Sequence, residues 1–120
     1  MIRAGAARFP DEAVQFVREG LAHTVKVTHG KDLPKVIDPA DESRHVSGQQ
    51  LCIGLRDVAV ERYGMLARTV LGYWGIQRTV DFGTIVYGLI DKGELRGSSR
   101  DSLEHFRDVY DFDEAFQGSV

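Results

Sequence analysis

Apolar residues recur at three- and four-residue spacing from Asp11 to Thr28, between Pro10 and Gly30. This spacing places them on one side of an α-helix, because a helix has about 3.6 residues per turn. The apolar side consists of Ala13, Val14, Phe16, Val17, Gly20, Leu21 and Val25. Charged and polar residues occupy most other positions, so the pattern predicts an amphipathic helix that packs on the rest of the domain.

The clearest helix start in the sequence is at Ser47. A serine at an N-cap accepts a hydrogen bond from a backbone N–H three residues on, and Gln50 is placed to reach back to it, which makes a capping box. We expect this helix to run to Tyr63 and to stop at Gly64. Its apolar residues lie on two sides, with Leu51, Leu55, Val58 and Ala59 on one side and Ile53 and Val60 on the other. Apolar residues on two sides predict a helix at the centre of the core.

Two further helices are predicted, from Met65 to Trp74 and from Thr79 to Lys92. Each is followed by a glycine, Gly75 or Gly93, which readily takes the backbone conformation that ends a helix. Thr79 is the expected N-cap of the second of these helices. The apolar residues of that helix keep helical spacing without a miss: Phe82, Ile85, Val86, Leu89 and Ile90.

The C-terminal part of the chain fits two structures. Leu95–Arg96, a turn at Gly97–Ser99 and the alternating aromatic residues of His105–Phe112 fit a small β-hairpin. Residues Asp101–Asp108 also fit a short helix, and a last helical turn is predicted at Asp111–Phe116. The predicted fold class is therefore mainly α, or α+β if the hairpin forms, with the helices arranged as a bundle.

The 120 residues, 42% of them hydrophobic, have the size and composition of one packed domain. Residues 31–44 contain Pro34, Pro39 and many charges without periodicity, so we expect a flexible connection there. Cys52 is the only cysteine and has no disulfide partner. Because we find neither a signal-peptide core nor a long charge-free segment, we expect a cytoplasmic protein that does not enter a membrane.

No motif for catalysis, cofactor binding or metal binding stands out. His23 and His29 are six residues apart, which does not place them on one helix face, and the other histidines are scattered. Cys52 falls on the apolar side of its helix, where a cysteine behaves as a small hydrophobic residue. No glycine-rich loop follows a strand. We therefore expect no cofactor, no metal and no enzymatic activity.

Charge is distributed unevenly along the chain. The net charge is −3, but residues 101–120 hold one arginine against six carboxylates. Acids alternate with aromatic residues in the acidic C-terminal strip, residues 101–116, at Tyr110, Asp111, Phe112, Asp113 and Phe116. Such a segment can offer its rings to a groove on a basic partner protein. The alternative, which we favour, is that the rings close the domain's own core while the acids face water.

Arg44 and His45 come shortly before the helix start at Ser47. A cation and an imidazole beside the free N–H groups of a helix start favour a small anion or a partner's carboxylate. The alternative, which we favour, is that Arg44 pairs with a carboxylate of the acidic C-terminal strip.

The outer side of the helix Thr79–Lys92 bears on DNA binding. With the apolar stripe inward, the outward residues are Val80, Asp81, Thr84, Tyr87, Gly88 and Asp91. They include no lysine or arginine, and phosphates repel the two carboxylates.

Within the same helix, Gly83 and Gly88 each cost about 1 kcal/mol of helix stability relative to alanine, so a close backbone approach is expected there. The approaching backbone belongs to the first helix or to a docking partner, a second copy in a homodimer included, with Tyr87 in the contact.

The order of the helices resembles a winged helix-turn-helix, with helices at Gln49–Tyr63, Met65–Trp74 and Thr79–Lys92 and a wing at Glu94–Phe112. Separately, five segments between Phe16 and Phe116 read FVREGLAHTV, RHVSGQQL, YGMLARTVLGYWGI, TVDFGTIVYGLI and DSLEHFRDVYDFDEAF. In this order they resemble a family of small bacterial proteins with no established activity. This second resemblance implies no activity, cofactor or site residue.

Together these features predict a non-enzymatic protein-interaction or regulatory module. A DNA-binding winged-helix regulator is the second hypothesis, and an enzyme of unknown class is the third. The negative net charge opposes specific DNA binding, because DNA affinity depends largely on cations that neutralise phosphates. A protein partner, with a basic one favoured by the acidic C-terminal strip, is the expectation.

Overall fold

The computed structural model describes residues 9–29, 46–95 and 102–116. Over these ranges the chain is mainly helical and forms no strand. The helices are α1 (Asp11–His29), α2 (Gly48–Tyr63), the 3-10 helix η3 (Gly64–Leu66), α3 (Ala67–Tyr73), α4 (Thr79–Asp91), the 3-10 helix η4 (Leu103–Phe106) and α5 (Phe112–Ala115). The flexible connection expected at 31–44 and the turn expected at Gly97–Ser99 lie outside the described residues. At 102–116 the short helices η4 and α5 form in place of a strand.

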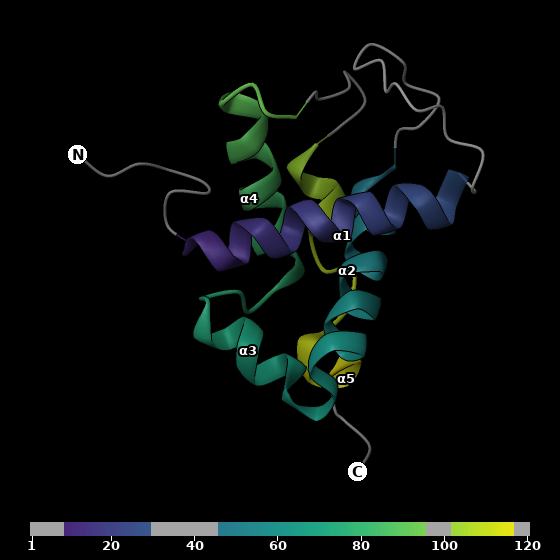
Figure 1. The fold of residues 1–120 in the computed structure, drawn as a ribbon, viewed down its shortest axis with the longest axis vertical. Coiled ribbons are helices and arrows are strands. Elements are labelled where there is room, and N and C mark those ends of the chain that lie inside the picture. Colours follow the sequence, from purple (N-terminus) through teal and green to yellow (C-terminus); the bar gives the residue numbers. More distant parts are fainter. Residues whose placement is uncertain (1–8, 30–45, 96–101, 117–120) are drawn as a thin grey trace.

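The helices are arranged in three layers. Figure 1 shows α1 lying across the front of the molecule, where it crosses α4 toward one end and α2 toward the other. Behind α1, helices α2, α3 and α4 make the middle layer, and the C-terminal elements η4 and α5 lie at the back (Figure 1). η4 packs on both α4 and α2. The middle layer is therefore covered from both sides by segments that are far apart in the sequence.

The contact between α1 and α2 is close because small residues meet where the two helices cross. A Cβ atom at Gly54 would collide with the Thr24 side chain, and one at Gly20 with Leu55. The Thr24 hydroxyl donates a 2.7 Å hydrogen bond to the Gly20 carbonyl, which leaves no unsatisfied polar group at the crossing. The apolar side predicted for the first helix faces this contact, and its first residues, Ala13, Val14, Phe16, Val17 and Gly20, are buried.

The predicted capping box of α2 is confirmed. The Gln50 N–H donates to Ser47 Oγ at 3.1 Å, and the Ser47 N–H donates to Gln50 Oε1 at 2.8 Å. The helix ends at Tyr63, as predicted. Helix α2 packs on α1, α3, α4, η3 and η4, in line with the predicted central position, but its second apolar side is not buried, because Ile53 and Val60 are 42% and 46% exposed.

Helix α4 is at least partly buried at every position before its last residue. None of residues 79–90 is exposed, whereas Asp91 at the end of the helix is exposed. The apolar stripe is confirmed by Phe82, Ile85 and Leu89, which are fully buried. The expectation that Asp81 faces outward is wrong, because this residue is 5% exposed.

The start of α4 differs from the prediction. Arg78 is the N-cap residue, and Asp81 Oδ2 accepts hydrogen bonds from the Gln77 and Arg78 N–H groups at 2.8 and 3.1 Å. The Thr79 hydroxyl instead donates to the Phe106 carbonyl at 2.5 Å and accepts from the Val109 N–H at 3.1 Å. Thr79 therefore joins α4 to the C-terminal segment and does not cap the helix.

The close approach expected at Gly83 is made by η4. A Cβ atom at Gly83 would lie 2.7 Å from Phe106 Cγ and 2.8 Å from Leu103 Cδ1. The expectation that α1 makes this approach is wrong at Gly83, because the C-terminal segment covers this side of α4. Tyr87, one turn further along, packs edge-on against Phe106 with ring centroids 6.3 Å apart.

Candidate functional site

The aromatic rings of the acidic C-terminal strip point into the core. Phe112 and Phe116 are 3% and 6% exposed, and their ring centroids are 5.1 Å apart. Phe112 also packs on Phe82 at 5.8 Å. The Tyr110 hydroxyl donates a 2.7 Å hydrogen bond to the Cys52 carbonyl. The favoured alternative, core closure by these rings, is confirmed, and the prediction that Phe112 and Phe116 offer themselves to a partner is wrong because both are buried.

Two acids of the strip, Asp111 and Asp113, lie on the surface and have local partners. Asp111 caps α5, since its Oδ2 accepts from the Glu114 N–H at 3.1 Å. Asp113 pairs with Arg68 at 3.3 Å, and the Arg68 guanidinium lies 5.5 Å from the centre of the Phe112 ring. These contacts attach α5 to α3 and hold the strip in place.

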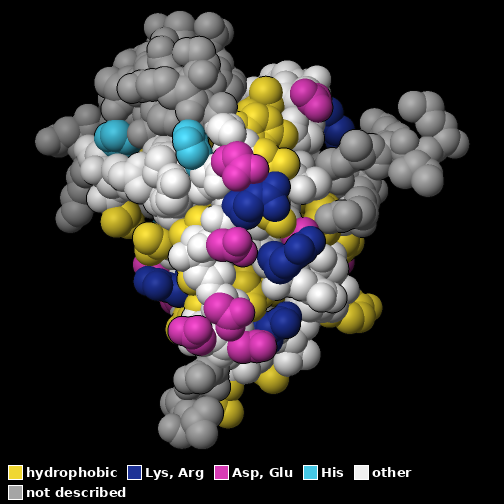
Figure 2. Space-filling model, turned by 180° about the vertical axis from the view of Figure 1, so that it is seen from behind, with side chains coloured by type: hydrophobic (Ala, Val, Ile, Leu, Met, Phe, Trp, Pro, Cys, Tyr) yellow, Lys and Arg dark blue, Asp and Glu magenta, His cyan; other side chains and the backbone are white. Residues whose placement is uncertain are grey.

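A polar cleft of about 320 Å³ lies beside these acids. Its lining includes the carboxylates of Asp108, Asp111 and Asp113 together with the guanidinium groups of Arg68 and Arg78. Figure 2, the view from behind, shows acidic and basic side chains interspersed on the face that carries η4 and α5. Because opposite charges neighbour one another, this cleft has little preference for a partner of either sign.

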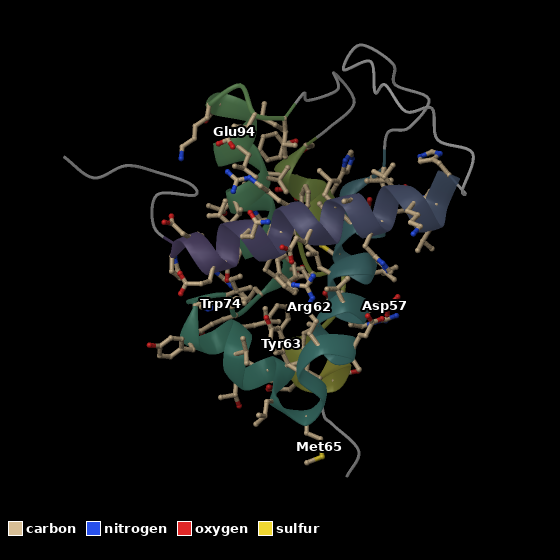
Figure 3. The ribbon with its side chains drawn as sticks, viewed as in Figure 1. Asp57, Arg62, Tyr63, Met65, Trp74 and Glu94 are labelled. Carbon is tan, nitrogen blue, oxygen red and sulfur yellow. The ribbon has the colours of Figure 1, made fainter. Side chains whose placement is uncertain are left out.

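A second hollow, of about 400 Å³, opens at the front between α1, the end of α2 and the end of α3. We call it the aromatic groove. Figure 3 shows Arg62, Tyr63 and Trp74 together below α1. The groove is lined by Asp11, Glu12, Gln15, Phe16, Glu19, Arg62, Tyr63 and Trp74.

Helix ends position the rings of the aromatic groove. Tyr63 is the last residue of α2, before Gly64, and Trp74 follows α3, before Gly75. Both glycines have positive φ, 52° and 85°, a conformation that turns the chain sharply and that other residues rarely adopt. Trp74 and Tyr63 are partly exposed and meet edge to face with centroids 6.1 Å apart. The buried ring of Phe16 in α1 lies 5.6 Å from the ring of Trp74 and packs against it.

The acids of the groove all come from α1. No hydrogen bond or ion pair engages the side chain of Asp11 or Glu12 within the described part of the chain, and both residues are exposed. Glu19 is engaged at both oxygens: Gln15 Nε2 donates to Oε2 at 3.0 Å, and Arg62 NH1 lies 2.5 Å from Oε1. The hydrogen bonds from Gln15 and Arg62 lower the pKa of Glu19 below its ordinary value. The groove is therefore negative, with three carboxylates against one guanidinium.

Large apolar side chains are also exposed at the corner where α2 meets α3. Met65 and Leu66 are 68% and 63% exposed at this corner, and Tyr73, at the opposite end of α3, is 87% exposed. Exposed apolar side chains of this size favour contact with another macromolecule over contact with water. Met65 and Leu66 are not among the residues that line the aromatic groove.

Sequence reasoning missed the residues of the aromatic groove. The available signal was an aromatic residue directly before each helix-ending glycine, at Tyr63 and Trp74, but that pattern does not place them beside Asp11. Of the predicted partner-binding residues, Arg44 and His45 lie outside the described residues. Tyr110, Asp111, Phe112 and Asp113 line the polar cleft, Phe116 lies in the core beside it, and Tyr87 packs on Phe106.

We searched the described ranges for a reactive cysteine and for a cluster of metal-ligating side chains. Cys52 is buried, and burial raises the pKa of its thiol to about 12. No three His, Cys, Asp or Glu side chains gather as a metal site in residues 9–29, 46–95 and 102–116. Among the helices that the structure describes, none combines the length and the apolar character needed to cross a membrane. Comparisons with protein-family models, with curated proteins and with solved structures find no match to this chain.

Proposed function

We propose that this protein is a non-enzymatic interaction module whose aromatic groove binds a basic segment of a partner protein. The observation that carries the proposal is the pairing of two unengaged carboxylates, Asp11 and Glu12, with the partly exposed rings of Tyr63 and Trp74 in one groove. Carboxylates and aromatic faces both attract cations, and together they favour a lysine or arginine side chain.

A lysine or arginine side chain has an apolar part and a charged part, and this groove offers a surface for each. The methylene stem of a lysine or arginine packs on an aromatic ring while its charged head stays near water and a carboxylate. Trp74 supplies the ring surface, and the first turn of α1 supplies the carboxylates. Desolvation of the charge is small because the groove is open, so binding depends on the rings and the acids together.

A DNA-binding function is the second candidate, and three observations disfavour it. Residues 79–90 of α4 are all at least partly buried, so this helix has no free face for a DNA groove. Arg62 pairs with Glu19 and Arg68 with Asp113, which reduces the positive charge open to phosphates. The aromatic groove itself is negative and repels phosphates. A second copy of this chain is also disfavoured as the occupant, because its net charge is −3.

Trp74 makes the proposal directly testable because it is the only tryptophan of the chain. We expect hexalysine to change the fluorescence of Trp74 and to shift its indole N–H signal in NMR spectra in a saturable manner. Hexaglutamate serves as the peptide of opposite charge and is expected to have no effect. Binding should weaken as salt is added, because the attraction between charges on an open surface is screened.

Two double variants locate the binding site. Asp11→Asn combined with Glu12→Gln neutralises the groove, and Asp113→Asn combined with Glu114→Gln neutralises a matching pair of acids in α5. The first is expected to abolish hexalysine binding, while the second leaves it largely intact. Thermal unfolding of each variant controls for the stabilisation that acids give to a helix start. Equal loss in the two variants, or no response of Trp74 to hexalysine, contradicts the proposal.

A further inference from the structure

Arg62 and Glu19, which both line the aromatic groove, form an ion pair with each other. Arg62 NH1 lies 2.5 Å from Glu19 Oε1, and the two side chains are 41% and 40% exposed. Hydrogen bonding to Glu19 raises the pKa of Arg62, so the guanidinium is charged at all working pH values. Figure 3 shows Arg62 below α1 and near Tyr63.

Glu19 lines the same groove as Asp11 and Glu12, but its carboxylate is already engaged. One oxygen faces Arg62, and the other accepts from Gln15. An incoming lysine or arginine has the same charge as Arg62, so both cannot hold the same oxygen. Arg62 stands at the end of α2, is well exposed and has a long flexible side chain, so it can leave Glu19 for water without disturbing the helix.

From this geometry we infer that Arg62 is a built-in competitor for the basic partner segment, and this inference rests on the proposed function. In the free protein the guanidinium of Arg62 holds Glu19 in the place of the partner's cation. Binding replaces the ion pair between Arg62 and Glu19 with one between the partner's cation and Glu19. The free energy of breaking the first pair therefore reduces the free energy gained on binding. The pair therefore lowers the affinity of the groove and favours segments with more than one cation, which also reach Asp11 and Glu12.

The test measures hexalysine affinity at Trp74 at physiological salt in Arg62→Gln and in the matched variant Arg56→Gln. Arg56 lies on the same helix, is similarly exposed and pairs with Asp57, away from the groove (Figure 3). Both variants remove one positive charge, but only Arg62→Gln removes the competitor. Because an exposed ion pair contributes at most about 1 kcal/mol, we expect Arg62→Gln to bind up to about fivefold more tightly than Arg56→Gln.

The Glu19→Gln background completes the test. Without the Glu19 carboxylate there is no shared position, so Arg62→Gln and Arg56→Gln are expected to have equal effects in this background. Equal effects in the wild-type background overturn the inference, because they indicate only long-range charge. Weaker binding by Arg62→Gln also overturns it, since Arg62 would then contact the partner.

Failure of the proposed function has a different signature. If neither the wild-type protein nor Arg62→Gln responds to hexalysine, the groove does not bind basic segments and both proposals fail. If the wild-type protein responds and Arg62→Gln gains nothing over Arg56→Gln, the groove binds but Arg62 is not a competitor.

Discussion

At the scale of single residues, the buried position of Cys52 makes its thiol unreactive. Its side chain is fully buried in α2, and its backbone carbonyl accepts the hydrogen bond from Tyr110. Burial disfavours the charged thiolate and raises the pKa of Cys52 from 9.0 to about 12. Burial also raises the pKa of Tyr110. Both groups are therefore neutral structural elements at physiological pH.

We expect the Cys52 thiol of the folded protein to be inert toward a disulfide reagent at about pH 8, because the thiolate is the reactive species. The reaction should proceed only as fast as the protein unfolds, which can be followed by absorbance. The unfolded chain in guanidinium chloride is the control and should react at once. Rapid reaction of the folded protein would show that the thiol is accessible.

The same pKa predicts the direction of the alkaline stability profile. The folded state holds the thiol proton more tightly than the unfolded state does, so its contribution to stability is complete below pH 9.0. This contribution is lost as the pH rises toward about 12, the pKa of Cys52 in the folded state. Cys52→Ala should make the urea midpoint fall less steeply over this range than it does in the wild type. An unchanged slope would contradict the assignment.

At the scale of elements, α2 packs on α1, α3, α4, η3 and η4, and α4 packs on α1, α2 and η4. None of residues 79–90 of α4 is exposed, and its contact with η4 involves Thr79 and Gly83 as well as the apolar stripe. Ile53 and Val60 of α2, by contrast, remain exposed. An apolar residue in a helical pattern is buried only if a further element lies over it, which the pattern of one helix does not show.

Leu89→Ala tests which side of α4 faces the core, with Asp91→Ala, two residues away, as the control variant. Leu89 is fully buried, so its truncation is expected to lower the free energy of unfolding by about 2 to 5 kcal/mol. Asp91 is exposed, and its truncation should change stability by less than about 0.5 kcal/mol. Urea unfolding measures both values. Similar losses in the two variants would mean that the helix faces the core differently.

At the scale of the whole molecule, two aromatic clusters lie on opposite sides of the middle layer. Phe16, Tyr63 and Trp74 meet at the front, where two of the rings remain partly open. The C-terminal rings, with Phe112 and Phe116 among them, meet at the back and are closed. The front cluster is therefore available for binding, while the back cluster holds the end of the described chain against α4.

Phe116→Ala separates these two roles. We expect the variant to lose about 3 to 5 kcal/mol of stability, because it leaves a cavity where a ring is 6% exposed. The exposed neighbour Glu114→Ala should lose little. Below the melting temperature, Phe116→Ala should still bind hexalysine at Trp74 with unchanged affinity. A loss of affinity in the folded variant would place the binding site in the acidic C-terminal strip instead of the aromatic groove.

The features that were predictable from the sequence are local ones. The start of α2 depends on Ser47 and Gln50, three residues apart, and the ends of α2 and α3 depend on Gly64 and Gly75. Such features involve hydrogen bonds and backbone conformations within a few residues, so neighbours in the sequence are sufficient to determine them. The apolar stripes of α1 and α4 were predictable for the same reason, because helical periodicity is a property of a single segment.

Tertiary structure decided which surfaces are covered. Thr79 has the chemistry of a cap, but its hydroxyl bonds to Phe106 and Val109 because the C-terminal segment lies there. Phe116 is buried and Trp74 stays partly open, although both are aromatic residues at the end of a short helix. Burial depends on elements that arrive from distant parts of the chain. For that reason the aromatic groove, where the ends of α2 and α3 meet the first turns of α1, is a property of the packed helices and of no single segment.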